Sequence, residues 1–236
     1  MLRLPRPLFS LLVLLTLTGG ASAAPSPATR TAGLVRQDGF LPLYWDANSG
    51  KLLVELSPAR LGSAFLYFSG LGSGVGSTQM FADRSSPAES LLCRFHRVGP
   101  RVLVIAENTG FRAPAGSPEL QHSVAFSFPT TVLAALPIEA EQDGVLLVNA
   151  NPLVVRDAFD LLRQLRYPYR VRNGTVSPAT QPTAGNWRLD AERSAIDVAH
   201  TRSFPGNTEV QALLTFTSDN PVSYTHLRAH ETGRNL

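Results

Sequence analysis

The sequence is poor in residues that could cross-link a small fold. Only one of its 236 residues is cysteine, Cys93, so no internal disulfide can form. Cys93 lies in an apolar run typical of a strand, where a free cysteine is most often a small buried hydrophobic side chain. A nucleophilic cysteine would need a base and an electropositive setting around its thiol, and we could locate neither from the sequence. We therefore expect Cys93 to be buried and unreactive.

The glycine-rich stretch at residues 69–77 lacks the known nucleotide-binding and nucleophile motifs. The dinucleotide fingerprint G-x-G-x-x-G fails whether it is counted from Gly70 or from Gly72. No Gly-Lys pair follows to complete a P-loop, and the G-x-S-x-G pattern of the nucleophile elbow is missing as well. We interpret the stretch as a flexible loop, or as a place where a partner's backbone comes close.

Metal-binding and triad motifs are absent too. His226 and His230 are four residues apart, but the His-Glu-x-x-His motif fails because position 227 is leucine, and its inverted form fails because position 229 is alanine. No spacing of Asp, Ser and His selects a catalytic triad. The lone strand histidine, His96, is expected to face solvent or to be satisfied locally. We predict no catalytic residue, no cofactor-binding residue and no metal ligand in this chain.

The charge balance excludes some partners. The chain has 21 basic and 18 acidic residues, with a single lysine, and this preference for arginine is typical of a GC-rich bacterial gene. Without Arg3, Arg6, Arg228 and Arg234, which lie in the two terminal segments, the basic residues fall to 17. Without Glu231 the acidic residues also fall to 17. The remaining segment is near neutral and gives no reason to expect binding to nucleic acid or to an anionic membrane.

The N-terminus has the three parts of a secretory signal peptide. Arg3 and Arg6 form the basic region, residues 8–17 the apolar region, and Ala21-Ser22-Ala23 the small-residue cleavage site. The apolar run is too short to span a bilayer. We predict a signal peptide at 1–23, a loose linker at 24–36 that is rich in Pro, Ser, Thr and Ala, and a periplasmic or secreted mature protein with no membrane contact after cleavage.

The C-terminus differs from the rest of the chain. Residues 222–232, VSYTHLRAHET, resemble the translation of a transposon-derived sequencing adapter in one reading frame. We expect residues 222–236 to be an assembly artefact, and we leave them out of the fold prediction.

Short apolar runs separated by turn residues predict antiparallel hairpins. Runs at 40–44 and 51–56 flank the turn DANSG, and a third run follows at 65–68. Gly99-Pro100 separates the runs at 91–98 and 101–106. Further strands are expected at 132–138 and 145–148, joined through Asp143-Gly144, and at 187–189, 195–199 and 209–216. In the last of these, Val210, Ala212, Leu214 and Phe216 share one face, and Leu213 lies on the other.

One amphipathic helix is predicted at about 152–166. Asn151 suits the N-cap, Pro152 suits the first helical position, and Tyr167-Pro168 ends the pattern. The apolar stripe consists of Val154, Ala158, Leu161, Leu162 and Leu165. Residues 120–128 fit either a short helix or a strand. The predicted fold is mainly β (β-rich α+β), with antiparallel hairpins packed around one core, over a single domain at 37–221.

Four blocks of the chain carry a resemblance. They are DGFLPLYWDANSGKLLVEL, FLYFSGLGSGVGS, DRSSPAESLLCRFHRVGPRVLVI and SFPGNTEVQALLTFT. Together they resemble the N-terminal domain, of unknown function, of large bacterial secreted zinc-dependent metalloproteases. In that family the zinc site lies in a later domain on a His-Glu-x-x-His helix, which this chain lacks. The resemblance implies a non-catalytic fragment whose partner is the missing C-terminal catalytic domain in cis, with zinc only in that domain.

Two alternatives remain. A stand-alone periplasmic binding module of β type would fit the signal peptide and the glycine-rich stretch, which could line a ligand site. A self-contained hydrolase would need a triad that no spacing selects. If the protein continues beyond residue 221, the apolar strand at 209–216 should be covered by the downstream part of the chain, because exposed strand edges pair between chains.

Overall fold

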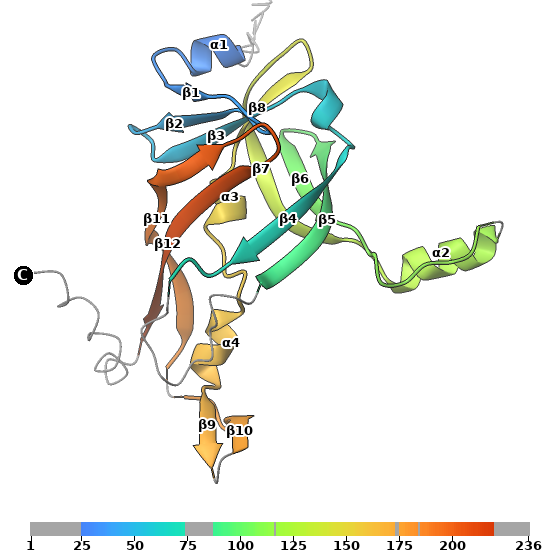
Figure 1. Ribbon diagram of the computed structural model, residues 1–236, viewed down its shortest axis with the longest axis vertical. Coiled ribbons are helices and arrows are strands. Elements are labelled where there is room, and N and C mark those ends of the chain that lie inside the picture. The colour runs from blue at the N-terminus through green and yellow to red at the C-terminus, as the bar shows by residue number, and fades with distance from the viewer. Residues whose placement is uncertain (1–24, 74–86, 116, 173–174, 184, 220–236) are drawn as a thin grey trace, which may run out of the picture.

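The structure, a computed structural model, describes residues 25–73, 87–115, 117–172, 175–183 and 185–219. The expected signal peptide and the expected adapter-derived tail lie outside these residues. The described chain is mainly β, as predicted (Figure 1). Its strands are β1 (Arg36–Gln37), β2 (Leu43–Asp46), β3 (Lys51–Leu56), β4 (Ala64–Gly70), β5 (Pro87–Val98), β6 (Arg101–Ala106), β7 (Thr131–Gln142), β8 (Val145–Asn149), β9 (Tyr169–Arg172), β10 (Thr175–Pro178), β11 (Trp187–Ser203) and β12 (Thr208–Ser218). The helices are α1 (Pro27–Arg30), α2 (Pro118–Ser127), α3 (Asn151–Val154) and α4 (Leu161–Arg166), with a 3-10 turn at Pro58–Arg60.

Eight strands form one antiparallel sheet in the order β1-β2-β3-β8-β7-β6-β5-β4. It joins two meanders, β1–β3 and β4–β8, where β3 pairs with β8. Register shifts after Val104 in β6 and after Ile138 in β7 are of the kind that bends strands, and the sheet curls. The β11–β12 ribbon forms a sheet of its own and packs against the inside of the curl (Figure 1).

The three predicted hairpins are confirmed, and their turns have local causes. In the β2–β3 turn the Asp46 carboxylate accepts the backbone N–H of Asn48 at 3.1 Å. In the β7–β8 turn Asp143 and Gly144 have φ of 51° and 77°, the left-handed geometry that two-residue hairpin turns require. Sequence-local turn chemistry therefore sets the register of these strand pairs.

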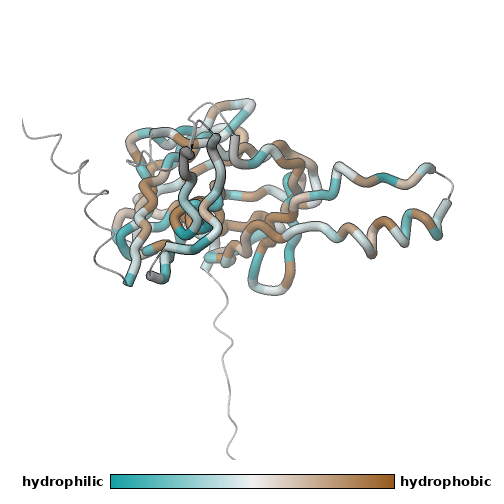
Figure 2. Tube along the Cα trace, turned by 90° about the horizontal axis from the view of Figure 1, so that it is seen from below, coloured by the Kyte–Doolittle hydropathy of each residue, from teal (hydrophilic) through white to brown (hydrophobic). Residues whose placement is uncertain are grey.

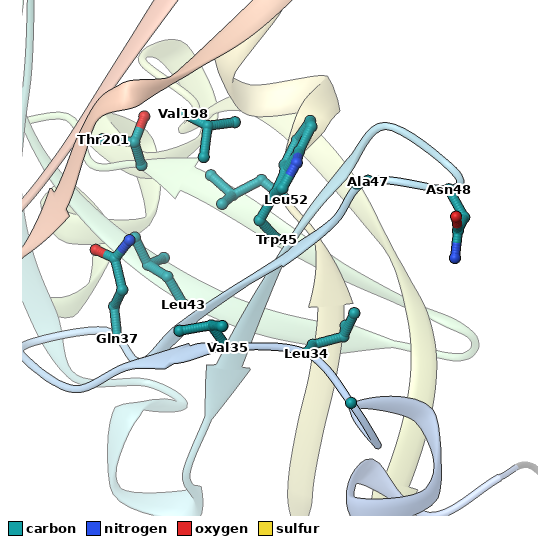
Figure 3. A pocket seen from close by; sticks show the side chains of 11 residues that line it. Leu34, Val35, Gln37, Leu43, Trp45, Ala47, Asn48, Leu52, Val198 and Thr201 are labelled. Atoms are coloured by element: carbon teal, nitrogen blue, oxygen red, sulfur yellow. The ribbon is translucent and has the colours of Figure 1, made fainter.

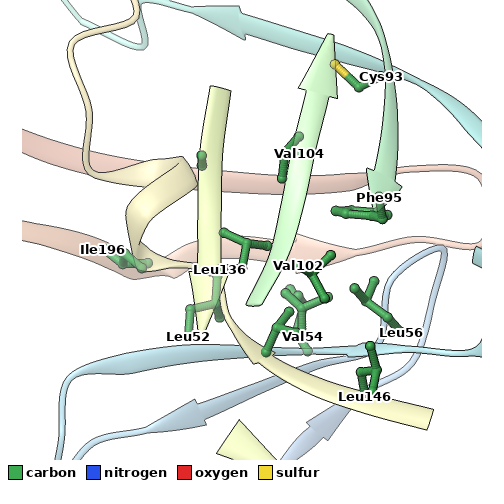
Figure 4. Close-up of a cluster of buried hydrophobic side chains, with 14 of the residues drawn as sticks. Leu52, Val54, Leu56, Cys93, Phe95, Val102, Val104, Leu136, Leu146 and Ile196 are labelled. Carbon is green, nitrogen blue, oxygen red and sulfur yellow. The ribbon is translucent and has the colours of Figure 1, made fainter. Parts of the chain in front are cut away.

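The main core fills the inside of the curled sheet (Figure 4). Phe95 of β5 stacks on Phe65 of β4 with ring centroids 4.6 Å apart, and Ile196 brings β11 into the same cluster. Full burial of each aliphatic side chain contributes about 1.5–3 kcal/mol. The cluster's fully buried members include Leu43, Leu52, Leu56, Cys93, Val102, Val104, Leu136, Leu146 and Val148.

A second, smaller cluster lies on the opposite face of the sheet, where the sequence predicted one core only. Tyr44, Leu53, Ala140 and Leu147 are buried there, and Leu34 packs on them. The central strands β2, β3 and β8 are thus buried on both faces, which explains why their sequences are continuously apolar rather than alternating.

Residues 25–36, expected to be part of a loose linker, instead pack on the domain. The short helix α1 begins at Pro27, after Ser26 accepts the N–H of Thr29 at 3.1 Å. Arg30 then pairs with Asp46 at 2.8 Å and lies 3.6 Å from Glu139. These contacts hold the segment against β2 and β7, and β1 follows as the edge strand of the sheet.

β11 was predicted as two strands and is one strand with two bulges, each built from the same five-residue pattern. At the first bulge the Ser194 hydroxyl donates to the carbonyl of Asp190 at 2.6 Å and accepts the N–H of Thr215 at 2.9 Å. The Asp190 carboxylate pairs with Arg193 at 2.7 Å. The hydroxyl thus replaces a backbone group in the ladder, and the extra residues are accommodated without a break.

The second bulge repeats this arrangement seven residues later. The Thr201 hydroxyl donates to the carbonyl of Asp197 at 2.8 Å and accepts the N–H of Gln211 at 3.4 Å. His200 lies 2.8 Å from the Asp197 carboxylate, as Arg193 pairs with Asp190 in the first bulge. The repeat D-x-x-[R/H]-[S/T] therefore shapes this strand twice.

The prediction of one continuous helix over about 152–166 is wrong. The chain forms α3 and α4, with residues 155–160 outside both. The Asp157 carboxylate accepts the N–H groups of Leu161 and Leu162, both at 2.8 Å, and so starts a new helix. Asp160 has a left-handed φ of 52°, which interrupts the helical geometry. The predicted end before Pro168 is confirmed, because α4 stops at Arg166.

Asn151 is not the N-cap that the sequence predicted. Its side chain accepts the N–H of Leu52 at 2.9 Å and donates to the carbonyl of Gly50 at 2.9 Å. The residue therefore ties the β8–α3 connection to the start of β3, a tertiary role that competes with capping.

An arm at residues 107–130 leaves the sheet between β6 and β7 and carries α2. Figure 2 shows the arm extending away from the body, with apolar positions along it. None of the residues of α2 is buried. Within the described ranges no helix is long and apolar enough to cross a membrane.

Candidate functional site: an apolar pocket beside the edge strand

A pocket of about 460 Å³ lies between the first three strands and the β11–β12 ribbon (Figure 3). Pockets for small ligands in proteins typically measure about 300–1,000 Å³. Its lining comes from residues far apart in the sequence: Gly33, Leu34, Val35, Gln37, Leu43, Trp45, Ala47, Asn48, Leu52, Val198 and Thr201.

The floor of the pocket is the inner face of β1, β2 and β3. Gln37 pairs with Leu43, and Trp45 pairs with Leu52, so these four side chains share one face. Val35 precedes Gln37 by two residues and lies on that face as well, at the open lip, where it is 79% exposed. Because side chains alternate between the two faces of a strand, the apolar side chains of this face lie beside the side-chain amide of Gln37.

The roof of the pocket is the second bulge of β11. Val198 and Thr201 belong to it, and the pattern beginning at Asp197 pushes them out of regular pairing. The segment that follows Gln37 is held against the end of β11, because the Phe40 N–H donates to the carbonyl of Phe204 at 2.7 Å. Gly39 allows this close approach, because a Cβ there would lie 2.3 Å from the Ser203 hydroxyl oxygen.

The polar groups at the pocket are few and uncharged. In the part of the chain that the structure describes, no Asp, Glu, Lys or Arg lines it. The Thr201 hydroxyl is used within its bulge. The Gln37 amide makes no hydrogen bond with a described residue, and Figure 3 shows it beside Leu43 at the pocket. Such a surface is suited to binding an apolar group and lacks the titratable residues of proton-transfer chemistry.

Within the described residues, the cysteine and the histidine that were considered from the sequence do not line this pocket. Cys93 is fully buried, as predicted, and burial raises the pKa of its thiol to about 11, helped by the charge of Glu89. His96 is exposed on β5, in agreement with the expectation that it faces solvent. No three His, Cys, Asp or Glu side chains cluster as a metal site within the described ranges. His226 and His230 lie outside them.

The glycine-rich stretch is described only as far as Ser73. Within it, Gly72 comes close to β12, since a Cβ there would lie 2.9 Å from the Gln211 side-chain nitrogen. The group that approaches Gly72 is a side chain of the chain's own ribbon, so the approach of a partner stays a prediction.

Sequence reasoning missed the pocket. The apolar runs at 40–44 and 51–56 supply part of its floor, but nothing local pairs that floor with residues 198–201. Only the curl of the sheet brings the two segments together.

Comparison with known families gives one match. A family model described as Domain of unknown function (DUF5117) matches residues 86–233, more than half of the chain. The chain belongs to the DUF5117 family. No curated protein and no solved structure matches it. The family region begins just before β5, so β1–β4 and the pocket floor precede it, and only the roof lies inside the DUF5117 region. The match also takes in residues 222–233, and it gives the adapter interpretation no support.

Proposed function

We propose that this DUF5117 chain is the non-catalytic N-terminal domain of a secreted bacterial zinc-dependent metalloprotease, and that it packs against the catalytic domain of the same polypeptide. The metalloprotease part of the proposal is supported by the resemblance of the four sequence blocks. The docking part is supported by an apolar surface that the described chain leaves uncovered. Zinc belongs to the catalytic domain in this proposal, and no residue of this chain is assigned to it.

The observation that carries the docking role is the outer face of the β4–β7 half of the sheet. Leu66 and Phe68 of the edge strand β4 are 83% and 65% exposed. Leu66 pairs with Leu92, and Ile105 of β6 pairs with the exposed Val132 of β7, so these side chains continue the same face. The Arg94–Glu107 ion pair lies on this face as well, because Arg94 pairs with Ile105. Exposed apolar side chains gathered on one face with polar residues beside them typically mark a protein contact.

The α2 arm carries further exposed apolar side chains. Phe126, near the end of α2, is 83% exposed, and Leu120 is exposed as well. Isolated helices shorter than about 12–15 residues are marginal in water, so a helix of ten residues without buried side chains gains little from its own domain. A partner surface would supply the packing that α2 lacks.

Contacts at the base of the arm fix the direction in which it leaves the sheet. Phe111 and Phe128 stack with ring centroids 3.7 Å apart. Asn108 donates to the carbonyls of both phenylalanines at 3.3 Å and accepts the N–H of Gly110 at 3.1 Å. These contacts fix where the arm leaves the sheet, as expected for a docking element.

Hydrogen exchange tests the proposal. In this chain alone, the amides of α2 should exchange rapidly, and in the full-length product of the gene they should be protected. Phe126→Lys in the full-length protein should restore rapid exchange, and Phe204→Lys, an exposed apolar position on the turn of the ribbon, should not. Equal exchange of α2 in both proteins would refute docking through the arm.

A stand-alone periplasmic binding module of β type is the second candidate. The pocket between β1–β3 and β11 favours it, because its volume and apolar lining suit a small ligand. It replaces the glycine-rich stretch as the support for this alternative.

A further inference from the structure

We infer that the pocket between β1–β3 and the second bulge of β11 binds an uncharged, apolar ligand that carries one amide-like group. The inference deepens the binding-module alternative and is independent of docking through the β4–β7 face, which lies elsewhere on the domain. It rests on the volume of the pocket, on the absence of charged residues among the described residues that line it, and on the Gln37 side-chain amide.

The volume sets the size of the ligand. A protein cavity of about 150 Å³ holds a benzene molecule. The pocket measures about 460 Å³ and therefore has room for a bicyclic ring with a short substituent, or for an apolar amino-acid side chain with its adjoining peptide group.

The lining sets the charge of the ligand. Leu43 and Leu52 are almost fully buried at the floor, and Trp45 and Val198 pack against the main core beside them. No charged described residue lines the pocket to compensate an ionised ligand. Bringing an unpaired charge into such surroundings is strongly unfavourable, so a neutral ligand should bind in preference to its anion.

The side chain of Gln37 determines which polar group the ligand should carry. Its amide carries a donor and an acceptor on a half-buried side chain, and neither has a partner among the described residues. A ligand amide could satisfy both at once, whereas a purely apolar ligand that covered Gln37 would displace water from them and replace none of its hydrogen bonds. The pocket therefore selects an amide over a hydrocarbon of the same size.

A matched pair of probes tests the inference in the full chain. 1-Naphthaleneacetamide is neutral, and 1-naphthaleneacetate has the same ring with a carboxylate. Titration would follow the indole N–H signals of ¹⁵N-labelled protein. The chain has two tryptophans, so Trp187→Phe assigns the Trp45 signal. The amide should shift the Trp45 signal saturably, and the acetate should bind at least tenfold more weakly.

Three variants locate the site. Val198→Phe fills the pocket and should abolish binding of the amide, whereas Leu213→Phe, on the same ribbon but outside the pocket, should leave it unchanged. Gln37→Leu should weaken binding of the amide at least fivefold, and it decides the matter if Val198→Phe fails to fold. No shift of Trp45 up to the solubility limit, equal binding of the two probes, or unchanged binding by Gln37→Leu would each overturn the inference. Such a failure would leave the docking proposal standing, because hydrogen exchange of α2 tests that separately.

Discussion

At the scale of single residues, Asp46 shows how one side chain links two segments. It ends β2, caps the following turn and pairs with Arg30 of α1. Hydrogen bonds from the Ser49 hydroxyl and from Arg30 lower the pKa of its carboxyl to about 2. Sequence reasoning found the turn, because Asp, Asn, Ser and Gly act locally. It did not find the ion pair, because Arg30 looked like part of a linker.

The lowered pKa of Asp46 predicts an acid-dependent contribution to stability. An aspartate in the unfolded chain has a pKa of about 3.9, so the ionised carboxylate stabilises the fold above pH 4. That contribution is lost as the pH falls through the folded value of about 2. Asp46→Asn should lower the melting temperature at pH 7, and its difference from the wild type should vanish near pH 2.

Thermal melts between pH 7 and pH 2 measure this difference. Asp143→Asn, in the exposed β7–β8 turn, is the control, because asparagine also tolerates the left-handed φ there. A difference for Asp46→Asn that stays constant down to pH 2 would contradict the assignment.

At the scale of elements, the sequence predicted best where structure is local. The hairpins and the helix end before Pro168 follow from turn residues and proline. The helix at 152–166 failed because the apolar stripe has helical spacing on both sides of Asp157, whose carboxylate instead starts α4. β11 looked like two strands because its bulges interrupt the alternation.

Ser194 tests the role of the side-chain hydroxyls in the bulges. Ser194→Ala removes the hydroxyl that accepts the N–H of Thr215 and leaves that half-buried group without its partner. The free energy of unfolding should fall by about 1–2 kcal/mol. Ser177→Ala, at an exposed position of β10, should change it by less than about 0.5 kcal/mol. Urea denaturation measures both, and equal effects would show that the hydroxyl does not hold the bulge.

The two faces of β12 differ in exposure, one facing the interior and the other facing solvent. Leu213 is 63% exposed, and Leu214 is half-buried, as the alternation predicted. Leu214→Lys should destabilise the fold by about 1–3 kcal/mol, because it brings a charge toward the interior. Leu213→Lys should change stability by less than about 0.5 kcal/mol and reduce any self-association of the chain.

Thermal melts and sedimentation of the two variants test this assignment. Equal, large destabilisation by both would mean that β12 is buried on both faces, and the idea of a ribbon face open to a partner would have to be dropped.

At the scale of the whole molecule, the sequence predicted a mainly β domain of antiparallel hairpins. It could not predict the curl that brings residues 35–45 against residues 198–201, because the pocket depends on contacts between distant segments. It also missed the second, smaller cluster on the opposite face of the sheet and the uncovered face of β4–β7, since burial and exposure are properties of the assembled sheet. The pocket and the docking face are therefore the parts of the candidate function that needed the structure.

Our main proposal is that this DUF5117 domain belongs to a longer protease. An independent read of the gene, downstream of the codon for Asn220, is the decisive test. We expect the adapter-like codons to be absent, the reading frame to continue, and a His-Glu-x-x-His helix to be encoded further on. Genomic confirmation of residues 222–236 followed by a stop codon would contradict the proposal.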